Sequence, residues 1–260
     1  MPSKTGAAPD EFAERQLLKR AVELADRSLD RDIPCFTEFL TLAEQDSLQR
    51  TFAAERPWVN FTFDGGYPEA ERRVACFGAD SAPLIWLEIA PTAPKFAETL
   101  AHRDFLGALM SLGMRRETMG DILITDNRAY LAALETAAEF ISAQLESVRH
   151  TPVKVSRIDK PPVEAAPRPE PSSVVVSSPR LDALIAAVWK LSRSDAQSAV
   201  ERRAVFINGR CIEDSDHTPA VNDIVSVRGL GRFVFLGIER ETRKGRLRVD
   251  VGLYAASGKN

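Results

Sequence analysis

Arginines recur along residues 178–209 at positions where the phosphates of a nucleic acid could be bound. Arg180 precedes a short apolar repeat, Arg193 stands at the start of a second repeat, and Arg202 follows its end. The planar guanidinium fork of arginine matches the geometry of phosphate and keeps its charge at physiological pH. Ser194 and Gln197 face outward beside them. The segment therefore indicates a surface along which a phosphate backbone could lie.

The first element that must hold these side chains is a helix beginning near residue 178. Ser178 is suited to cap it, and Pro179 suits its first turn, because a proline there gives up only an N–H that lacks a helical partner. Apolar residues at i, i+3, i+4 and i+7 predict one buried stripe, with Arg180 and Asp182 on its flanks. The stripe consists of Leu181, Leu184, Ile185 and Val188.

A second short helix and a strand follow. Ser192, with Asp195 three positions later, predicts the start of this helix, and small apolar residues give it an inward face. Residues 205–207 then read as a strand that enters Asn208-Gly209, the dipeptide most typical of a two-residue hairpin turn. The order is therefore helix, tight turn, helix, strand.

The same residues carry a resemblance. The segments RLD at 180–182, SRSDA at 192–196, VFING at 205–209 and DIVSVRGLGRF at 223–233 resemble the RNA-binding domain first known from small-subunit ribosomal protein S-four. That family presents its two helices and the following strand to structured RNA. The resemblance implies RNA contacts at Arg180, Arg193, Ser194, Gln197, Arg202, Arg203, Arg228 and Arg232. Where the family usually has glycine, this chain has Arg203 and Asn222, and asparagine tolerates a left-handed turn better than arginine does.

Composition sets the outer limits of the interpretation. With 260 residues, 44% hydrophobic and 27% charged, the chain matches a globular protein of two or three domains. No apolar run is long enough to span a bilayer and the N-terminus lacks the layout of a signal peptide, so a cytoplasmic location is expected. Cys35, Cys76 and Cys211 are isolated, which predicts reduced, partly buried thiols rather than a metal site. No cofactor is expected.

Charge is divided unevenly along the chain. From Pro179 onward there are 14 Lys and Arg against 10 Asp and Glu, a net charge of +4, whereas the preceding part has 20 against 27, a net charge of −7. A basic part in an otherwise acidic chain is typical of a nucleic-acid-binding domain, although a solvated surface without a partner has the same composition.

The N-terminal half predicts two domains, giving an α+β fold overall. Residues 11–56 read as a helical segment, with helices at 11–30 and 37–54 separated by Ile33-Pro34. Residues 57–158 open with two strands about a glycine-rich turn at 64–68. They continue as a βαββαβ series that predicts a ferredoxin-like middle domain, with strands at 84–89, 121–125, 129–134 and 153–158 and helices at 94–112 and 136–148.

One part of the middle domain is rich in polar residues. His102-Arg103-Asp104 and the segment from Gly113 to Asp121, which includes Arg115 and Arg116, lie around the end of a helix. Kinase and nucleophile-base readings fail because the accompanying motifs are missing. Two interpretations remain open. Asp104 or Asp121 pairs with a neighbouring arginine in a structural corner, or Arg103, Arg115 and Arg116 form a second RNA contact.

A second resemblance covers most of the chain. GGYPEAERR at 65–73, LEIAP at 87–91, KF at 95–96 and HRDFLGALMSLGMRRETMGDILI at 102–124, together with the C-terminal domain, look like the YlmH-type RNA-binding proteins. The resemblance implies a helical segment, a ferredoxin-like middle domain and a small C-terminal α/β RNA-binding domain at 174–256. It also implies association with the large ribosomal subunit, and in some members the clearing of peptidyl-tRNA from stalled ribosomes. A proline-rich linker is expected at 159–173.

We therefore expect a cytoplasmic, non-catalytic, monomeric protein that binds ribosomal RNA or tRNA. One rival is an RNA-modifying enzyme that uses the C-terminal domain for targeting, which needs a catalytic constellation in the middle domain. Another is a protein-interaction scaffold, which predicts that Arg193 and Arg202 are dispensable for the protein's associations.

Overall fold

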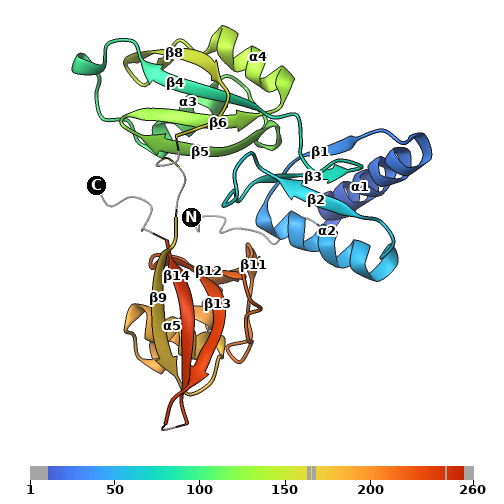
Figure 1. Cartoon of the computed structure of the whole chain (residues 1–260). Helices are drawn as coiled ribbons and strands as arrows, with labels where there is room; N and C mark the ends of the chain where they lie inside the picture. The colour runs from blue at the N-terminus through green and yellow to red at the C-terminus, as the bar shows by residue number, and fades with distance from the viewer. Residues whose placement is uncertain (1–10, 163–164, 166–167, 244, 255–260) are drawn as a thin grey trace. The chain divides into compact units, whose positions relative to one another are not determined.

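The computed structural model describes residues 11–162, 165, 168–243 and 245–254 (Figure 1). The chain divides after residue 166 into a first and a second unit. Both combine helices with antiparallel sheets, as the α+β prediction requires.

The first unit begins with a small layered structure. Helix α1 (Glu11–Arg31), strand β1 (Cys35–Leu40), helix α2 (Leu42–Glu55), strand β2 (Phe61–Asp64) and strand β3 (Arg73–Phe77) follow in that order. The strands form an antiparallel sheet in the order β1-β3-β2. The pairing of β2 with β3 across the glycine-rich turn agrees with the alternating pattern in the sequence.

The prediction that residues 11–56 are only helical is wrong at β1. A capping box sets the start of α2: the Thr41 hydroxyl accepts a hydrogen bond from the Glu44 N–H at 3.4 Å, and the Glu44 carboxylate accepts one from the Thr41 N–H at 2.7 Å. The helix therefore cannot extend back through residues 37–40. Those residues, following Pro34, instead extend and pair with β3. The signal was present in the sequence as Thr41-x-x-Glu44.

The ferredoxin-like prediction is confirmed in topology. Strand β4 (Ile85–Pro91), helix α3 (His102–Ser111), strands β5 (Met119–Thr125) and β6 (Arg128–Ala133), helix α4 (Glu135–Gln144) and strand β8 (Thr151–Ile158) form the βαββαβ series. The sheet order is β5-β6-β4-β8-β7, where β7 (Ser147–Val148) is an added short edge strand. Two short 3-10 turns, η1 (Pro94–Phe96) and η2 (Arg116–Thr118), flank α3. The helix predicted from Pro94 therefore begins only at His102.

The two faces of this sheet pack against different elements. Side chains such as Leu87 and Ile89 pack with Phe105 of α3 and Ile141 of α4. On the opposite face, Trp86 and Tyr130 pack with Phe39 of β1 and with Val74 and Cys76 of β3. Tyr130 is only 5% exposed. The sheet face on which RNA-recognition domains of this fold stack bases is therefore covered here.

Gly120 of β5 lies close to the Phe39 ring of β1, on the sheet face that β1 and β3 cover. A Cβ atom built on it would lie 2.8 Å from Phe39 Cε1 and 3.2 Å from Ala132 Cβ, and the Phe39 ring is buried. We expect Gly120→Ala to lower the free energy of unfolding by about 1–3 kcal/mol, because the packed ring must move. Urea unfolding measures it. Gly107→Ala is the control, since nothing lies within 4 Å of a Cβ there; an equal loss in both variants would contradict the packing argument.

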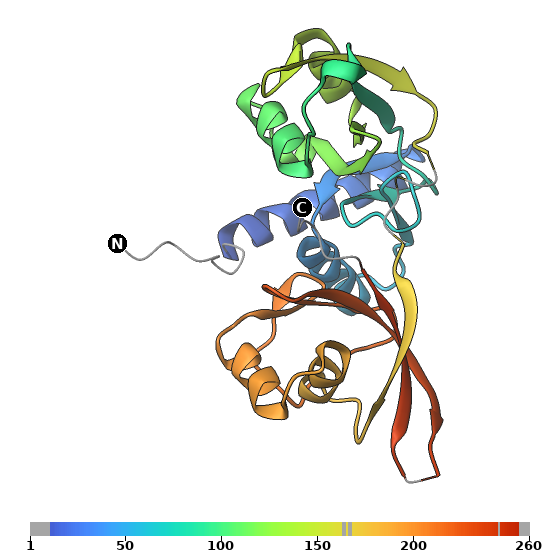
Figure 2. The same ribbon diagram turned by 90° about the vertical axis from the view of Figure 1, so that its left-hand side faces the viewer.

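The second unit is a six-stranded antiparallel sheet with two helices on one face (Figure 2). Its elements are β9 (Glu170–Val176), α5 (Leu181–Trp189), α6 (Arg193–Glu201), β10 (Val205–Ile207), β11 (Arg210–Cys211), β12 (Ile224–Val227), β13 (Gly231–Glu241) and β14 (Leu247–Leu253). The sheet order is β11-β10-β12-β13-β14-β9. Strand β9 corrects the predicted linker, because residues 170–173 pair with β14. Residues 163–164 and 166–167 of that linker, and 255–256 of the predicted domain, lie outside the described residues.

The start of α5 also differs from the prediction. The N-cap residue is Arg180, not Ser178, and no described side chain caps the helix. The N–H groups of Leu181 and Asp182 donate instead to the carbonyls of His217 and Ser215, at 2.8 and 3.2 Å. A loop from a distant part of the chain thus takes the role expected of a local cap. The Ser192 cap of α6 is confirmed by the bond from the Asp195 N–H to its hydroxyl, at 3.1 Å.

Candidate nucleic-acid interface

A buried carboxylate organises the arginines of the two helices. Asp182, in the first turn of α5, has no exposed surface. Its Oδ2 atom accepts hydrogen bonds from Arg193 at 2.8 Å, from Arg180 at 3.2 Å and from Gln197 at 3.2 Å. Arg180 also forms an ion pair with Asp216. We call Asp182, Arg180, Arg193 and Gln197 the Asp182 cluster.

The Asp182 cluster holds its carboxylate in the charged form. Burial alone raises the pKa of Asp182, but the hydrogen bonds and charges of Arg180 and Arg193 outweigh it, and the pKa lies below its usual value. The side chains of Arg180 and Arg193 stay partly exposed, at 33% and 45%. Each arginine is therefore held by the buried carboxylate while part of its side chain faces solvent. Such an arrangement can receive an anion without first ordering two long side chains.

The remaining helix residues lie nearby on α6 and in the turn after it. Ser194 is exposed and its hydroxyl is 2.8 Å from that of Ser192. Arg202 caps the end of α6 and is exposed. Arg203 is exposed as well and pairs with Glu213 at 3.0 Å. The backbone at Arg203 and Asn222 has φ values of 56° and 74°, so both non-glycine residues adopt the left-handed conformation that glycine supplies in related domains.

Arg228 and Arg232 belong to a different surface. Phe206, Ser226 and Arg232 are register partners on neighbouring strands, and the residues that alternate with them pack under the helices. Arg228 lies over the ring of Phe206 at 4.7 Å, and Arg232 over that of Tyr254 at 4.5 Å. These arginines therefore occupy the sheet face turned away from α5 and α6. The single basic surface implied by the resemblance is two surfaces in the structure.

Sequence reasoning missed the central residue of the first surface. It placed Asp182 on the flank of a helix, whereas the structure buries it. The Arg-x-Asp spacing at 180–182 was a usable signal. It places an acidic residue in the first helical turn close to an arginine, and a carboxylate that becomes buried needs such a partner. Phe206 and Tyr254 had no signal of this kind.

The predicted second contact receives less support. Arg116 donates to the carbonyls of Met119 at 2.8 Å and Gly120 at 2.7 Å, and burial beside Arg72 lowers its pKa to about 10. Arg116 therefore stabilises the loop before β5. Arg115 is exposed and pairs with Glu38, and Arg103 is exposed on the first turn of α3. Of these three arginines, Arg103 and Arg115 are the two that present cationic groups to solvent.

The polar corner around Asp121 is held together by hydrogen bonds. Its carboxylate accepts hydrogen bonds from the Tyr67 hydroxyl at 2.8 Å and from the N–H groups of Glu71 and Arg72 at 2.7 and 3.3 Å. Burial is the largest influence and raises the pKa of Asp121, although these bonds and the nearby arginines oppose it. Asp104 lies 4.0 Å from Arg149 and accepts from the Ala101 N–H at 2.8 Å. The structural interpretation of this segment thus has direct geometric support.

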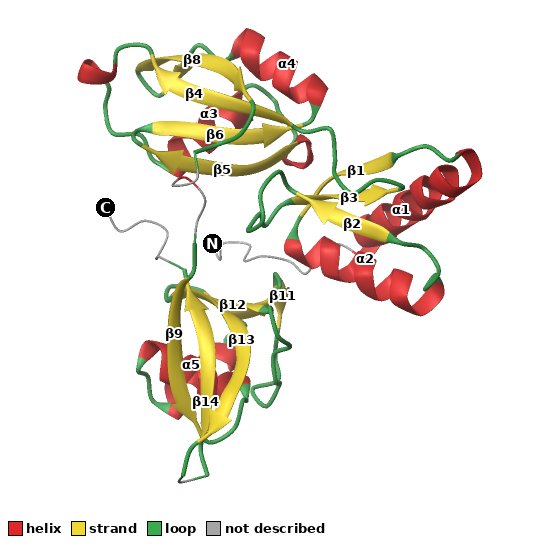
Figure 3. Cartoon of the chain, in the orientation of Figure 1, coloured by secondary structure: helices red, strands yellow, loops and turns green. Residues whose placement is uncertain are grey.

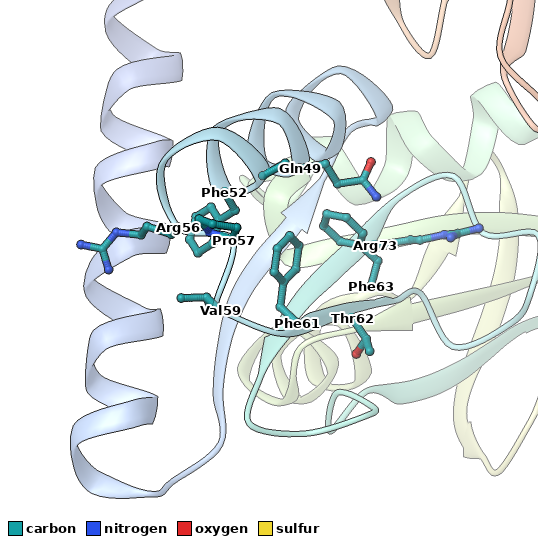
Figure 4. A pocket seen from close by; sticks show the side chains of 10 residues that line it. Gln49, Phe52, Arg56, Pro57, Val59, Phe61, Thr62, Phe63 and Arg73 are labelled. Carbon is teal, nitrogen blue, oxygen red and sulfur yellow. The ribbon is translucent and has the colours of Figure 1, made fainter.

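An open groove of about 630 Å³ lies beside α2 in the first unit (Figure 4). Phe52, Phe61 and Phe63 supply aromatic lining. Its two arginines are already engaged, Arg56 with Asp26 at 2.5 Å and Arg73 with the carbonyls of Ala70 and Pro68 at 2.6 and 2.9 Å. The groove therefore presents aromatic rings beside arginines that already have partners, rather than a set of reactive groups.

Other kinds of site find little support among the described residues. They contain no group of three or more His, Cys, Asp or Glu side chains placed to hold a metal ion. No described helix is long and apolar enough to cross a membrane. Cys35 and Cys76 are buried, and burial, with the charge of Asp64, raises the pKa of the Cys76 thiol to about 11.

The chain is similar to known RNA-binding and ribosome-associated proteins. Residues 85–161 match the family model described as a putative RNA-binding domain in YlmH. Ribosome-associated protein quality control protein P2 of Bacillus subtilis is 31% identical over 223 residues, which cover 82% of this chain and 84% of that protein. The solved structure of cell division protein ylmH from Streptococcus pneumoniae is 21% identical with a TM-score of 0.44, covering 60% of this chain and 96% of that one.

Proposed function

Because the chain belongs to the YlmH-type family of ribosome-associated RNA-binding proteins, we propose that its second unit binds structured ribosomal RNA or tRNA through the Asp182 cluster and Arg202. We further propose that the protein is non-catalytic, monomeric and cytoplasmic. It would act on the large ribosomal subunit, where it helps to clear stalled peptidyl-tRNA. The observation that carries it is the pair of half-exposed arginines fixed on one buried carboxylate.

The chemistry of the cluster suits RNA recognised by its shape. Guanidinium forks bind phosphate oxygens in two places at once, and folded RNA presents phosphates in fixed positions. A rigid pair of arginines selects among such positions better than flexible side chains do. The relative named for ribosome-associated quality control supports a ribosomal setting for this binding.

The RNA-modifying alternative needs reactive groups in the middle domain. The polar residues found there, Asp121, Arg72 and Arg116, are instead engaged with backbone groups. We therefore propose that the first unit supports binding and does not perform chemistry.

Arg202→Glu tests the proposal without disturbing the Asp182 cluster. We expect about tenfold weaker binding to purified large ribosomal subunits. The slope of log K against log salt should decrease by about one, which corresponds to the loss of one phosphate contact. Sedimentation through sucrose gradients at several salt concentrations measures both. Arg50→Glu, an exposed arginine on α2, is the control for the charge change. If wild-type protein stayed at the top of the gradient at low salt, ribosome binding would be ruled out.

A further inference from the structure

An almost fully exposed phenylalanine stands on the loop between β4 and α3. Phe96 is the last residue of the turn η1, and its side chain is 90% exposed. In Figure 3 this turn stands at the tip of the loop that leaves β4. Leu100, only four residues later, is 3% exposed. The loop thus buries one large apolar side chain and presents another.

The base of this loop is firmly anchored. The Asn127 side chain accepts a hydrogen bond from the Leu100 N–H at 2.7 Å and donates one to the Glu98 carbonyl at 2.9 Å. The Glu98 carboxylate binds Arg149 at 3.3 Å and the His150 N–H at 3.2 Å. Two neighbouring turns of the sheet therefore hold the loop in place.

The tip itself has a defined backbone. The Phe96 N–H donates to the Ala93 carbonyl at 3.0 Å, and Pro94 fixes one backbone angle of the turn. A backbone held in this way loses little conformational freedom when a partner covers the loop. The exposure of Phe96 is therefore a built feature of the loop rather than the result of a loose chain.

A cationic residue directly precedes the aromatic residue along the chain. Lys95 is exposed, as Phe96 is. An exposed aromatic side chain next to a cation matches an unpaired nucleotide, whose base stacks on the ring while its phosphate meets the cation. Resting on the proposed RNA-binding function, we propose that Phe96 stacks on an unpaired base of the bound RNA, as a contact separate from the Asp182 cluster.

Replacement of Phe96 separates stacking from charge. With deproteinised ribosomal RNA as the probe in filter binding, Phe96→Ala is expected to weaken binding about tenfold, and Phe96→Tyr to remain close to wild type. Stacking releases no counterions, so the slope of log K against log salt should stay unchanged in Phe96→Ala, whereas Arg202→Glu lowers it. Thermal unfolding should not change, because the side chain makes little contact with the fold.

Phe140→Ala is the matched control, since Phe140 lies on α4 of the same domain and is 45% exposed. Wild-type affinity in Phe96→Ala, or an equal loss in Phe140→Ala, would overturn this inference and leave the proposed function standing. A Phe96→Ala variant that bound RNA normally but no longer bound a protein partner would also overturn this inference and leave the proposed function standing. A wild-type chain that bound no RNA would overturn both.

Discussion

Asp182→Ala should weaken RNA binding although it removes a negative charge from a basic surface. Without the carboxylate, Arg193 loses the atom that fixes it and Arg180 is left with its exposed partner Asp216, so both side chains must be ordered again when RNA binds. We expect about tenfold lower affinity for ribosomal RNA. Simple charge counting predicts the opposite, because one less carboxylate should favour an anionic partner. The sign of the change therefore separates positioning from bulk electrostatics.

The control for this experiment removes the same charge elsewhere on the surface. Glu201 is exposed near the end of α6, so Glu201→Ala is expected to leave RNA affinity unchanged or slightly improved. Asp182→Asn keeps the shape of the side chain and one oxygen acceptor, and should fall between wild type and Asp182→Ala. If Asp182→Ala bound RNA as tightly as Glu201→Ala, Asp182 would have no positioning role.

Stability should change together with affinity. Asp182 accepts several charge-assisted hydrogen bonds, and their loss is expected to lower the unfolding free energy of the second unit by about 2–3 kcal/mol. Because the pKa of Asp182 in the folded chain lies below the usual value of 3.8, its contribution is fully present above that pH and disappears as pH falls through the lowered pKa. Amide exchange in α5 and α6 as a function of pH measures this, and Asp182→Ala should lose that part of the acid dependence.

Local patterns in the sequence were sufficient for elements whose ends are set by neighbouring residues. The Ser192 cap, the hairpin at Asp126-Asn127 with φ values of 49° and 60°, and the βαββαβ order all follow from short-range signals. The errors arose where distant chain segments decide the outcome. Residues 35–40 become a strand because β3 pairs with them, and α5 begins at residue 181 because the loop at 215–217 satisfies its first N–H groups.

The same distinction applies to the candidate site. Residue types and spacing identified the arginines of α5 and α6, but not the depth of the carboxylate beneath them. Nor could spacing show that Arg228 and Arg232 lie on the other face of the sheet, since this depends on the register of β10, β12 and β13. Burial and register are properties of the assembled sheet, and a single sequence contains them only indirectly.

Arg72→Ala is expected to destabilise the first unit strongly. Its guanidinium donates to three backbone carbonyls in separate segments: Met119 at 3.1 Å, Phe39 at 3.1 Å and Arg116 at 3.2 Å. Burial is the main cause of a lowered pKa for Arg72, and Glu44 and Asp121 oppose it. The side chain therefore links β1, the loop before β5 and β5 itself through hydrogen bonds to their backbone carbonyls.

Removing this side chain takes one donor from each of those carbonyls and breaks the link between the three segments, which should lower the free energy of unfolding by about 3 kcal/mol. Arg72→Lys should recover only part of the loss, because one ammonium group cannot reproduce the planar fork. Amide exchange in β1 and β5 locates the effect. Arg50→Ala, at a 67% exposed arginine that pairs with Asp46 on its own helix, should change stability by less than about 0.5 kcal/mol. A change equally small for Arg72→Ala would mean that packing around Phe39 and Trp86, rather than this arginine, holds the N-terminal layer on the ferredoxin-like sheet.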